Sequence, residues 1–420
     1  MSQPRFFFTT DFTQNPVSFM HVDINSCFAA IEQQANPFLR GKPVAVAAYT
    51  TNSGCILAAS IEAKRFGIKT GMRVFEGKQL CPYLYILPGD PSKYRFINQK
   101  LTKLLETYSP NLSIRSIDEM VLNFQNLPIL KQKTMQEIAL EIKSRMREEI
   151  GEWITVSIGI STNPYLAKLA AGLKKPDGLV EIDQQNILSI LSALKLTDLH
   201  YIKENNQLRL NRVDIFTPLD FYNASYQKLK LAFASINAYY WYARLHGFLI
   251  DEIEWGRKSI GHSFSLPRPT NNLFELKQIL CRLVEKIGRR LRKNNLTASG
   301  IFLSCGFVDG SGWHKSKTQE HAMFTTQELF TAICELLEMV KPLPPVRHLA
   351  VSSFGFTQGL YQQLDFLAAG QKNQALTQAM DRLNDRWGEF TVASALTLNM
   401  NQKVVDRIAF GKVHDMQQVV

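Results

Sequence analysis

Apolar and polar residues along the first 180 positions are spaced as in strands and helices that follow one another. Residues 18–23, SFMHVD, form a short apolar run that ends at Asp23 and predicts a strand. The next stretch, INSCFAAIEQQ, has the spacing of a helix, and residues 153–161, WITVSIGIS, alternate in the manner of a strand. We therefore expect an α/β arrangement in this part of the chain.

Two further helices are indicated by their apolar spacing and their end signals. Residues 131–150 place four apolar side chains on one helical face, namely Met135, Ile138, Ile142 and Met146. Asn163 is suited to cap a later helix that has Pro164 at its first position. Both helices belong to the same α/β region.

The pattern changes twice further along the chain. From about residue 186 to residue 247 the spacing is helical throughout. After a linker near residues 248–257, a long helix at 272–296 is followed by strands at 299–308 and 346–356. A chain of 420 residues is too long for one ordinary core. We therefore expect an α+β protein of several domains.

The net charge of +11 and the pI of about 9.3 indicate a polyanionic partner. Clustered Lys and Arg bind phosphates, but charge alone leaves nucleic acid and an anionic membrane surface both open. No apolar run has the length of a signal peptide core or a membrane span. The sequence thus predicts a cytoplasmic protein with no membrane partner.

The stretch RSIDEMVLNF, residues 115–124, places two carboxylates side by side. A solvated turn is the ordinary explanation. The alternative is a hairpin that makes Asp118 and Glu119 converge, since neighbouring residues of a flat strand point to opposite faces. Together with Asp23 they would then hold two Mg²⁺ ions for phosphoryl transfer. Nearby lysines would neutralise a triphosphate, unless they only form solvated helix faces.

Six segments of the chain carry a resemblance that favours the hairpin explanation. They occur in the order, and at close to the separations, found in Y-family DNA polymerases of the translesion type: HVDINSCFAAIE, GKPVAVAA, SGCILAASIEAKRFGIKTGM, SIDE, SIGISTNPYLAKLAAGLKKPDG and RKSIGHSFSLP. The similarity extends from about residue 18 to about residue 357. It implies a template-directed DNA polymerase that adds deoxynucleotides to a primer 3′ end. Low fidelity, low processivity and tolerance of DNA damage are implied as well.

The resemblance also implies a right-hand architecture with a ferredoxin-like palm, small fingers, a helical thumb and an α+β little finger. The expected boundaries are palm 1–26 and 91–182, fingers 27–90, thumb 183–246, linker 247–257, little finger 258–357 and a C-terminal extension 358–420. The implied partners are primer–template DNA and deoxynucleoside triphosphates. We expect the chain to act as a monomer.

Matching motifs place the metal-binding acids of the palm at Asp23, Asp118 and Glu119, and the backbone carbonyl of Ile24 beside them. The resemblance implies two Mg²⁺ ions, for which Mn²⁺ is a substitute. Phe28 matches an aromatic gate that excludes the ribose 2′-hydroxyl, although a core residue of its helix is the ordinary reading. The nucleotide-binding positions given by the same match are Phe28, Lys64, Lys175, Cys55 and Leu57, with Lys168 as a weaker candidate.

The sequence departs from the family at several of these positions. Where relatives have a tyrosine, an aromatic residue and an arginine near the nucleotide, this chain has Ile61, Ser26 and Lys64. Leu57 is larger than the usual alanine or serine over the base pair, which predicts poorer bypass of bulky adducts. The glycine-rich thumb turn is replaced by residues 201–203, Tyr-Ile-Lys, which predicts a weaker grip of backbone amides on DNA.

Basic side chains and one short peptide complete the expected contacts. The candidate contacts to the DNA backbone are Lys203, Arg257, Lys258, Arg289, Arg290, Arg292 and Lys293. The peptide QQLDFL resembles those that bind the sliding clamp, with anchors at Gln363, Leu364, Phe366 and Leu367. An ordinary amphipathic segment is the alternative for this peptide.

Two other functions stay open beside the polymerase. The first is a non-catalytic relative that binds DNA as a scaffold in a repair or mutagenesis assembly, which the departures around the nucleotide favour. The second is a cyclase-like palm that acts on free nucleotides, in which the basic thumb and little-finger residues would have no role.

Overall fold

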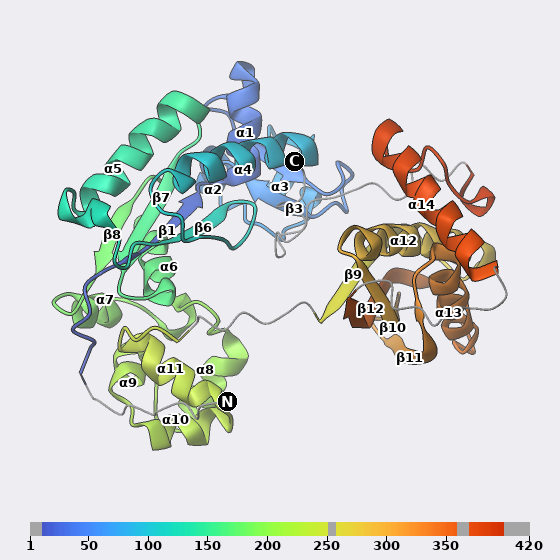
Figure 1. Cartoon of the computed structure of the whole chain (residues 1–420). Coiled ribbons are helices and arrows are strands. Elements are labelled where there is room, and N and C mark those ends of the chain that lie inside the picture. The colour runs from blue at the N-terminus through green and yellow to red at the C-terminus, as the bar shows by residue number, and fades with distance from the viewer. Residues whose placement is uncertain (1–10, 251–257, 359–368, 399–420) are drawn as a thin grey trace. The chain divides into compact units, whose positions relative to one another are not determined.

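The computed structural model describes residues 11–250, 258–358 and 369–398 (Figure 1). The described chain forms two compact units, residues 11–250 and residues 258–358 with 369–398. Each unit buries an apolar core of its own. This organisation confirms the predicted α+β chain of several domains. Within the described ranges, no helix has the length and apolar character needed to cross a membrane.

A five-stranded sheet of order β5-β6-β1-β7-β8 lies at the centre of the first unit. Its central strand β1 is antiparallel to both neighbours, while β7 and β8 are parallel. All residues of β1 are buried, so this strand is a rigid base for side chains at its end. The strands are β1 (Phe19–Ile24), β5 (Leu112–Ile114), β6 (Glu119–Asn123), β7 (Val156–Ser161) and β8 (Leu179–Ile182).

Helices cover both faces of this central sheet. The core on one face joins Met20 and Val22 of β1 to side chains of α1, α4, α5 and η3. It includes the four apolar residues predicted for one helical face, of which Met146 is the first residue of η3. Helix α6 packs on the other face, which makes β7 buried on both sides rather than on alternate residues only. The helices are α1 (Cys27–Ala35), α4 (Pro91–Glu106), α5 (Met135–Arg145) and α6 (Pro164–Leu173).

A small three-stranded sheet of order β3-β2-β4 follows α1. Its core is formed by short side chains such as Ala45 and Ala59 together with Ile56. The elements are β2 (Val44–Ala47), β3 (Ile56–Ala59), α2 (Ile61–Arg65), α3 (Val74–Leu80) and β4 (Tyr85–Pro88).

The region after residue 186 is helical, as the sequence predicts. Its helices are α7 (Ile187–Ser192), α8 (Glu204–Asn211), α9 (Pro218–Asn223), α10 (Tyr226–Phe233) and α11 (Asn237–Leu245). In the turn before α8, Tyr201 has a φ of 67°. This left-handed conformation is unfavourable for a residue with a Cβ. The turn thus has a backbone conformation typical of glycine, although a bulky tyrosine side chain occupies the position.

The second unit contains a four-stranded antiparallel sheet of order β11-β10-β12-β9. The two inner strands were predicted, whereas both edge strands were missed. β9 contains two prolines and β11 is rich in charged and polar residues, features that natural edge strands use. The elements are β9 (Ser259–Thr270), α12 (Leu273–Lys293), β10 (Leu296–Phe307), β11 (Gly312–Met323), α13 (Thr326–Glu338) and β12 (Val346–Gln358).

The C-terminal helix α14 (Ala369–Trp387) belongs to the second unit and packs against α12. Ion pairs join Asp381 and Asp385 of α14 to arginines of α12. Short helical turns complete the described elements: η1 (Pro37–Leu39), η2 (Pro128–Lys131), η3 (Met146–Ile150), η4 (Leu196–Asp198) and η5 (Ala395–Thr397).

Candidate active site

The acidic pair lies where the β5–β6 hairpin meets the end of β1. Glu119 is the first residue of β6 and is paired directly with Asp23 across the two antiparallel strands. Asp118 belongs to the connection before β6, and its carbonyl accepts a hydrogen bond of 2.9 Å from the backbone N–H of Ile24. The three carboxyl groups lie near enough to repel one another, and ligand atoms of Asp23 and Glu119 lie within 4.8 Å. All three carboxylates and Ile24 come together at one end of the central sheet.

Each of the three carboxylates accepts a hydrogen bond from a nearby side chain. Lys175 Nζ lies 2.6 Å from Asp23 Oδ1, and Lys168 Nζ lies 2.5 Å from Glu119 Oε2. Asp118 accepts from the hydroxyl of Ser116. The two lysines come from α6 and the segment after it, on the sheet face that carries Asp23. Two positive charges therefore offset the three acids in the absence of ligands.

Burial makes ionised acids costly at this position. It raises the pKa of Asp23 to about 6, despite the opposing charge of Lys175. Burial also raises the pKa of Asp118, and repulsion by Glu119 adds to the effect. A cation bound among these groups would favour their ionised forms. Hard oxygen donors of this kind fit Mg²⁺, so the residues present are suited to the ions that the sequence predicts.

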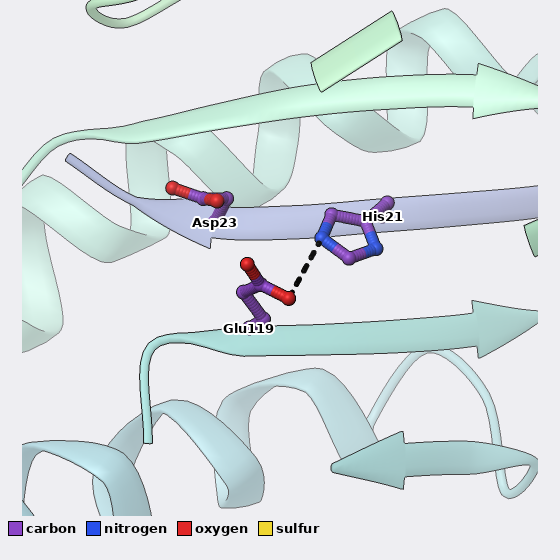
Figure 2. Close-up of side chains that lie close together, drawn as sticks. All are labelled: His21, Asp23 and Glu119. Atoms are coloured by element: carbon purple, nitrogen blue, oxygen red, sulfur yellow. Dashed lines mark ion pairs between the residues drawn. The ribbon is translucent and has the colours of Figure 1, made fainter. Parts of the chain in front are cut away.

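His21 is a further member of the site, and the sequence reasoning missed it. Its side chain is buried, and its Nε2 atom lies 3.8 Å from Glu119 Oε2. Figure 2 shows His21 and Asp23 on β1, with Glu119 facing them from β6. Ligand atoms of these three residues all lie within 4.8 Å of one another. The available signal was the spacing, because residues two apart in a strand share a face.

The imidazole of His21 is held in its neutral form. Burial lowers the pKa of His21, and the positive charge of Lys168 lowers it further. Burial also lowers the pKa of the neighbouring His200, whose Nε2 lies 3.3 Å from the carbonyl of Lys168. A neutral imidazole keeps a nitrogen lone pair.

Two of the departures from the family contact each other. Lys64 Nζ donates a hydrogen bond of 2.8 Å to the hydroxyl of Ser26. Burial lowers the pKa of Lys64, and the nearby charge of Lys175 lowers it further. The hydrogen bond needs the Oγ hydroxyl of a serine, which an aromatic residue at position 26 would lack. The presence of Ser26 and that of Lys64 are therefore physically linked.

The candidate gate Phe28 is buried in the core beside the site. Its ring is 1% exposed and stacks on Tyr94 with a centroid distance of 4.4 Å. Of the two roof candidates, Cys55 is exposed, and Leu57 is partly buried against the same core as Phe28. The structure therefore gives Phe28 a packing role whatever its effect on nucleotides.

The candidate DNA contacts differ in the exposure of their side chains. Lys203, Lys258 and Lys293 are exposed, and Arg290 donates a hydrogen bond of 3.3 Å to the carbonyl of Gly261. Arg257, a further candidate contact, lies outside the described residues. The clamp anchors Gln363, Leu364, Phe366 and Leu367 also lie outside them.

Two other candidate DNA contacts, Arg289 and Arg292, are engaged within the second unit. Arg292 makes two hydrogen bonds to the carboxylate of Asp381, at 2.5 and 2.9 Å, and its side chain is 6% exposed. Arg289 donates to Asp385 at 2.7 Å. Their guanidinium groups are thus paired with acids of α14 in place of solvent. A periodic sequence pattern cannot reveal such pairs between distant segments.

Comparison with known proteins identifies the family and the fold. Residues 22–172 match the impB/mucB/samB family, and residues 257–366 match the C-terminal domain of that family. The chain is similar in fold to a Y-family DNA polymerase chimera, with a TM-score of 0.70 and 25% identity over 81% of this chain and 99% of the other. An insertion ternary complex of Dbh DNA polymerase has a TM-score of 0.56 at 24% identity, with the same two coverages. The fold is therefore that of the right-hand polymerases predicted from the sequence.

Curated relatives make the assignment more specific. DNA polymerase IV of Pelotomaculum thermopropionicum is 30% identical over 90% of this chain and 94% of its own length. DNA polymerase IV of Moorella thermoacetica is 30% identical over 91% of this chain and 96% of its own length. The chain belongs to the impB/mucB/samB family, the Y family of DNA polymerases, which confirms the resemblance found in the sequence.

Proposed function

We propose that the chain is a template-directed DNA polymerase of the translesion type, which adds deoxynucleotides to a primer 3′ end. The observation that carries the proposal is the convergence of Asp23, Asp118 and Glu119 at the end of β1. The names of the relatives and of the solved complexes support the same activity. Primer–template DNA and deoxynucleoside triphosphates are the substrates. The domain boundaries given above for palm, fingers, thumb and little finger are part of this proposal.

The three acids and the carbonyl of Ile24 would hold two divalent cations, Mg²⁺ in the first instance. When bound, such a pair lowers the pKa of the primer 3′-hydroxyl and stabilises the charge that develops at the phosphorus. The protein contributes rigidity, because Asp23 and Glu119 lie on paired strands of a buried sheet. Fixed positions reduce the reorganisation needed when the reactants meet.

Lys175 and Lys64 would bind the triphosphate of the incoming nucleotide. Lys175 is half-exposed and now pairs with Asp23. A cation on Asp23 would release this lysine, so that its ammonium group could turn to a phosphate. Lys64 presents a point charge rather than the planar fork of an arginine, and its hydrogen bond to Ser26 holds it in place.

Phe28 would exclude ribonucleotides by contact with the 2′-hydroxyl. In this proposal the Phe28→Val variant accepts ribonucleotides more readily than the unchanged protein. Tyr94→Leu is the matched control, because it removes the stacking partner of Phe28 and leaves the candidate gate in place. A loss of sugar discrimination in both variants would assign the effect to packing alone.

Primer extension on an undamaged and an abasic template tests the proposed function. The assay supplies Mg²⁺ and either deoxynucleotides or ribonucleotides, and it includes an Asp118→Ala, Glu119→Ala variant as control. Extension that the control lacks supports the polymerase, and extension past the abasic position supports damage tolerance. Salt-sensitive DNA binding without any extension would instead identify a non-catalytic scaffold.

The same proposal includes low processivity and a contact with the sliding clamp. Sequence-independent contacts to the DNA backbone suit a polymerase that must move along any template. The candidates for such contacts among the described residues are Lys203, Lys258, Arg289, Arg290, Arg292 and Lys293, of which the three lysines are exposed. A Gln363→Ala, Leu364→Ala variant should lose stimulation by a clamp and keep its basal extension, which a clamp-loaded primer assay measures.

A further inference from the structure

His21 has no assigned role in the polymerase reaction, yet it lies inside the candidate site. The residue is 1% exposed, and neither ring nitrogen has a hydrogen-bond partner among the residues that the structure describes. Buried polar atoms without partners are rare because they lose water and gain nothing in return. A ligand that takes a nitrogen lone pair would account for this histidine.

The sheet geometry directs His21 toward the acids. His21 and Asp23 are two residues apart in β1 and therefore share a face, while Glu119 is opposite Asp23 on β6. One ligand atom from each residue lies within 4.8 Å of the others (Figure 2). Neighbouring ligands of an octahedral cation with bonds near 2.1 Å are about 3 Å apart. The three ligand atoms are thus farther apart than the ligands of a bound cation, and side-chain rotations on binding would have to close the difference.

A hydrogen bond within the protein does not explain the arrangement. The separation of 3.8 Å between His21 Nε2 and Glu119 Oε2 is too long for one. That oxygen instead accepts from Lys168 at 2.5 Å. The ring thus lies beside two carboxylates without a hydrogen bond to either.

We propose that His21 is a nitrogen ligand of the cation held by Asp23 and Glu119, and that it biases this site toward first-row transition ions such as Mn²⁺. The inference rests on the proposed function, which places a divalent cation at these acids. Mg²⁺ prefers oxygen ligands alone, whereas imidazole nitrogen favours first-row transition ions over it. The site would therefore bind Mn²⁺ more tightly than a purely carboxylate site does.

Electron paramagnetic resonance of bound Mn²⁺ tests the nitrogen ligand directly. The probe is Mn²⁺ alone, added to the full chain after removal of metals, with no DNA or nucleotide. Electron spin echo modulation should show a coupled nitrogen, and its frequencies should change when the histidines carry ¹⁵N. This measurement on the unchanged protein does not depend on any variant folding correctly.

Variants then identify which histidine is responsible. His21→Phe and His21→Gln should both lose the nitrogen coupling and weaken Mn²⁺ binding by about tenfold or more. Competition by Mg²⁺ should show a smaller change in Mg²⁺ affinity, so that the preference for Mn²⁺ falls. His200→Gln is the matched control, because His200 lies nearby and should leave the coupling intact.

The outcomes separate this inference from the proposed function. Bound Mn²⁺ that shows no coupling to a histidine nitrogen would overturn the ligand role of His21. Coupling that remains in His21→Phe, or that is lost in His200→Gln, would overturn it as well. Primer extension by the same unchanged protein reports on the polymerase independently. Extension without coupling removes only the His21 inference, and coupling without extension removes only the polymerase.

Discussion

Substitution of Asp23 by asparagine should stabilise the metal-free protein at neutral pH. Asp23 is 9% exposed, and burial raises the pKa of its carboxyl group from 3.8 to about 6. The folded chain therefore binds this proton more tightly than the unfolded chain does. At a pH above both pKa values, ionisation of Asp23 therefore lowers the free energy of unfolding. An asparagine side chain does not ionise and so avoids this loss of stability.

The magnitude follows from the two pKa values. A difference of about two pH units corresponds to about 3 kcal/mol of unfolding free energy when Asp23 is fully ionised. The stabilising effect of the proton is complete below pH 3.8 and is lost as the pH rises through about 6. The advantage of Asp23→Asn should accordingly be small near pH 4 and reach its full size above pH 7. Lys175 is half-exposed and can turn to water when its partner is removed.

Urea unfolding in EDTA at several pH values between 4 and 8 measures this difference. Asp90→Asn is the control with the opposite sign, because a hydrogen bond from Ser92 lowers the pKa of Asp90 in its helix cap. Ionised Asp90 stabilises the folded chain when the pH is above the pKa that Asp90 has in the unfolded chain. This stabilisation is lost as the pH falls through its lower folded pKa. A difference for Asp23→Asn that stays flat between pH 4 and 8, or reverses sign at pH 8, would refute the reasoning from burial.

Three further predictions concern packing, pairing and the base-pair roof. Gly159→Ala should destabilise the first unit by about 3 kcal/mol or more in thermal unfolding, because an added Cβ would lie 2.0 Å from the carbonyl oxygen of Ala167. Unchanged unfolding would contradict that packing. A double-mutant cycle of Arg292→Leu and Asp381→Leu should give a coupling of about 2 kcal/mol in urea, and additive effects would show that the pair contributes nothing. Leu57→Ala should improve extension past bulky adducts and leave undamaged synthesis unchanged in primer assays; equal bypass by both proteins would rule out a tight roof.

Local signals in the sequence were sufficient for the elements that carry the acids. The apolar run before Asp23 predicted β1, and Asn163 caps α6 as expected by accepting a hydrogen bond of 2.8 Å from the N–H of Leu166. Apolar periodicity works here because these elements are buried against the core. The resemblance to the family added the correct fold, which periodicity alone does not define.

Other features depend on contacts between distant residues. The edge strands β9 and β11 have little apolar alternation, since only part of each is buried. The pairing of Arg292 with Asp381 joins residues far apart in the chain, and the contact between Lys64 and Ser26 joins two separate elements. His21 is the first residue of the matching segment HVDINSCFAAIE, but the resemblance assigns it no role. Its place beside Glu119 follows only from the register of β1 and β6.

The separate cores of the two units have a consequence for how this protein changes over generations. Substitutions inside one core must be compensated within that same core, because packing is a local constraint. The unit that holds the acids can therefore be inherited almost unaltered while the other accumulates new surface residues. Replacement of the second unit as a whole would therefore leave the packing around the three acids unchanged.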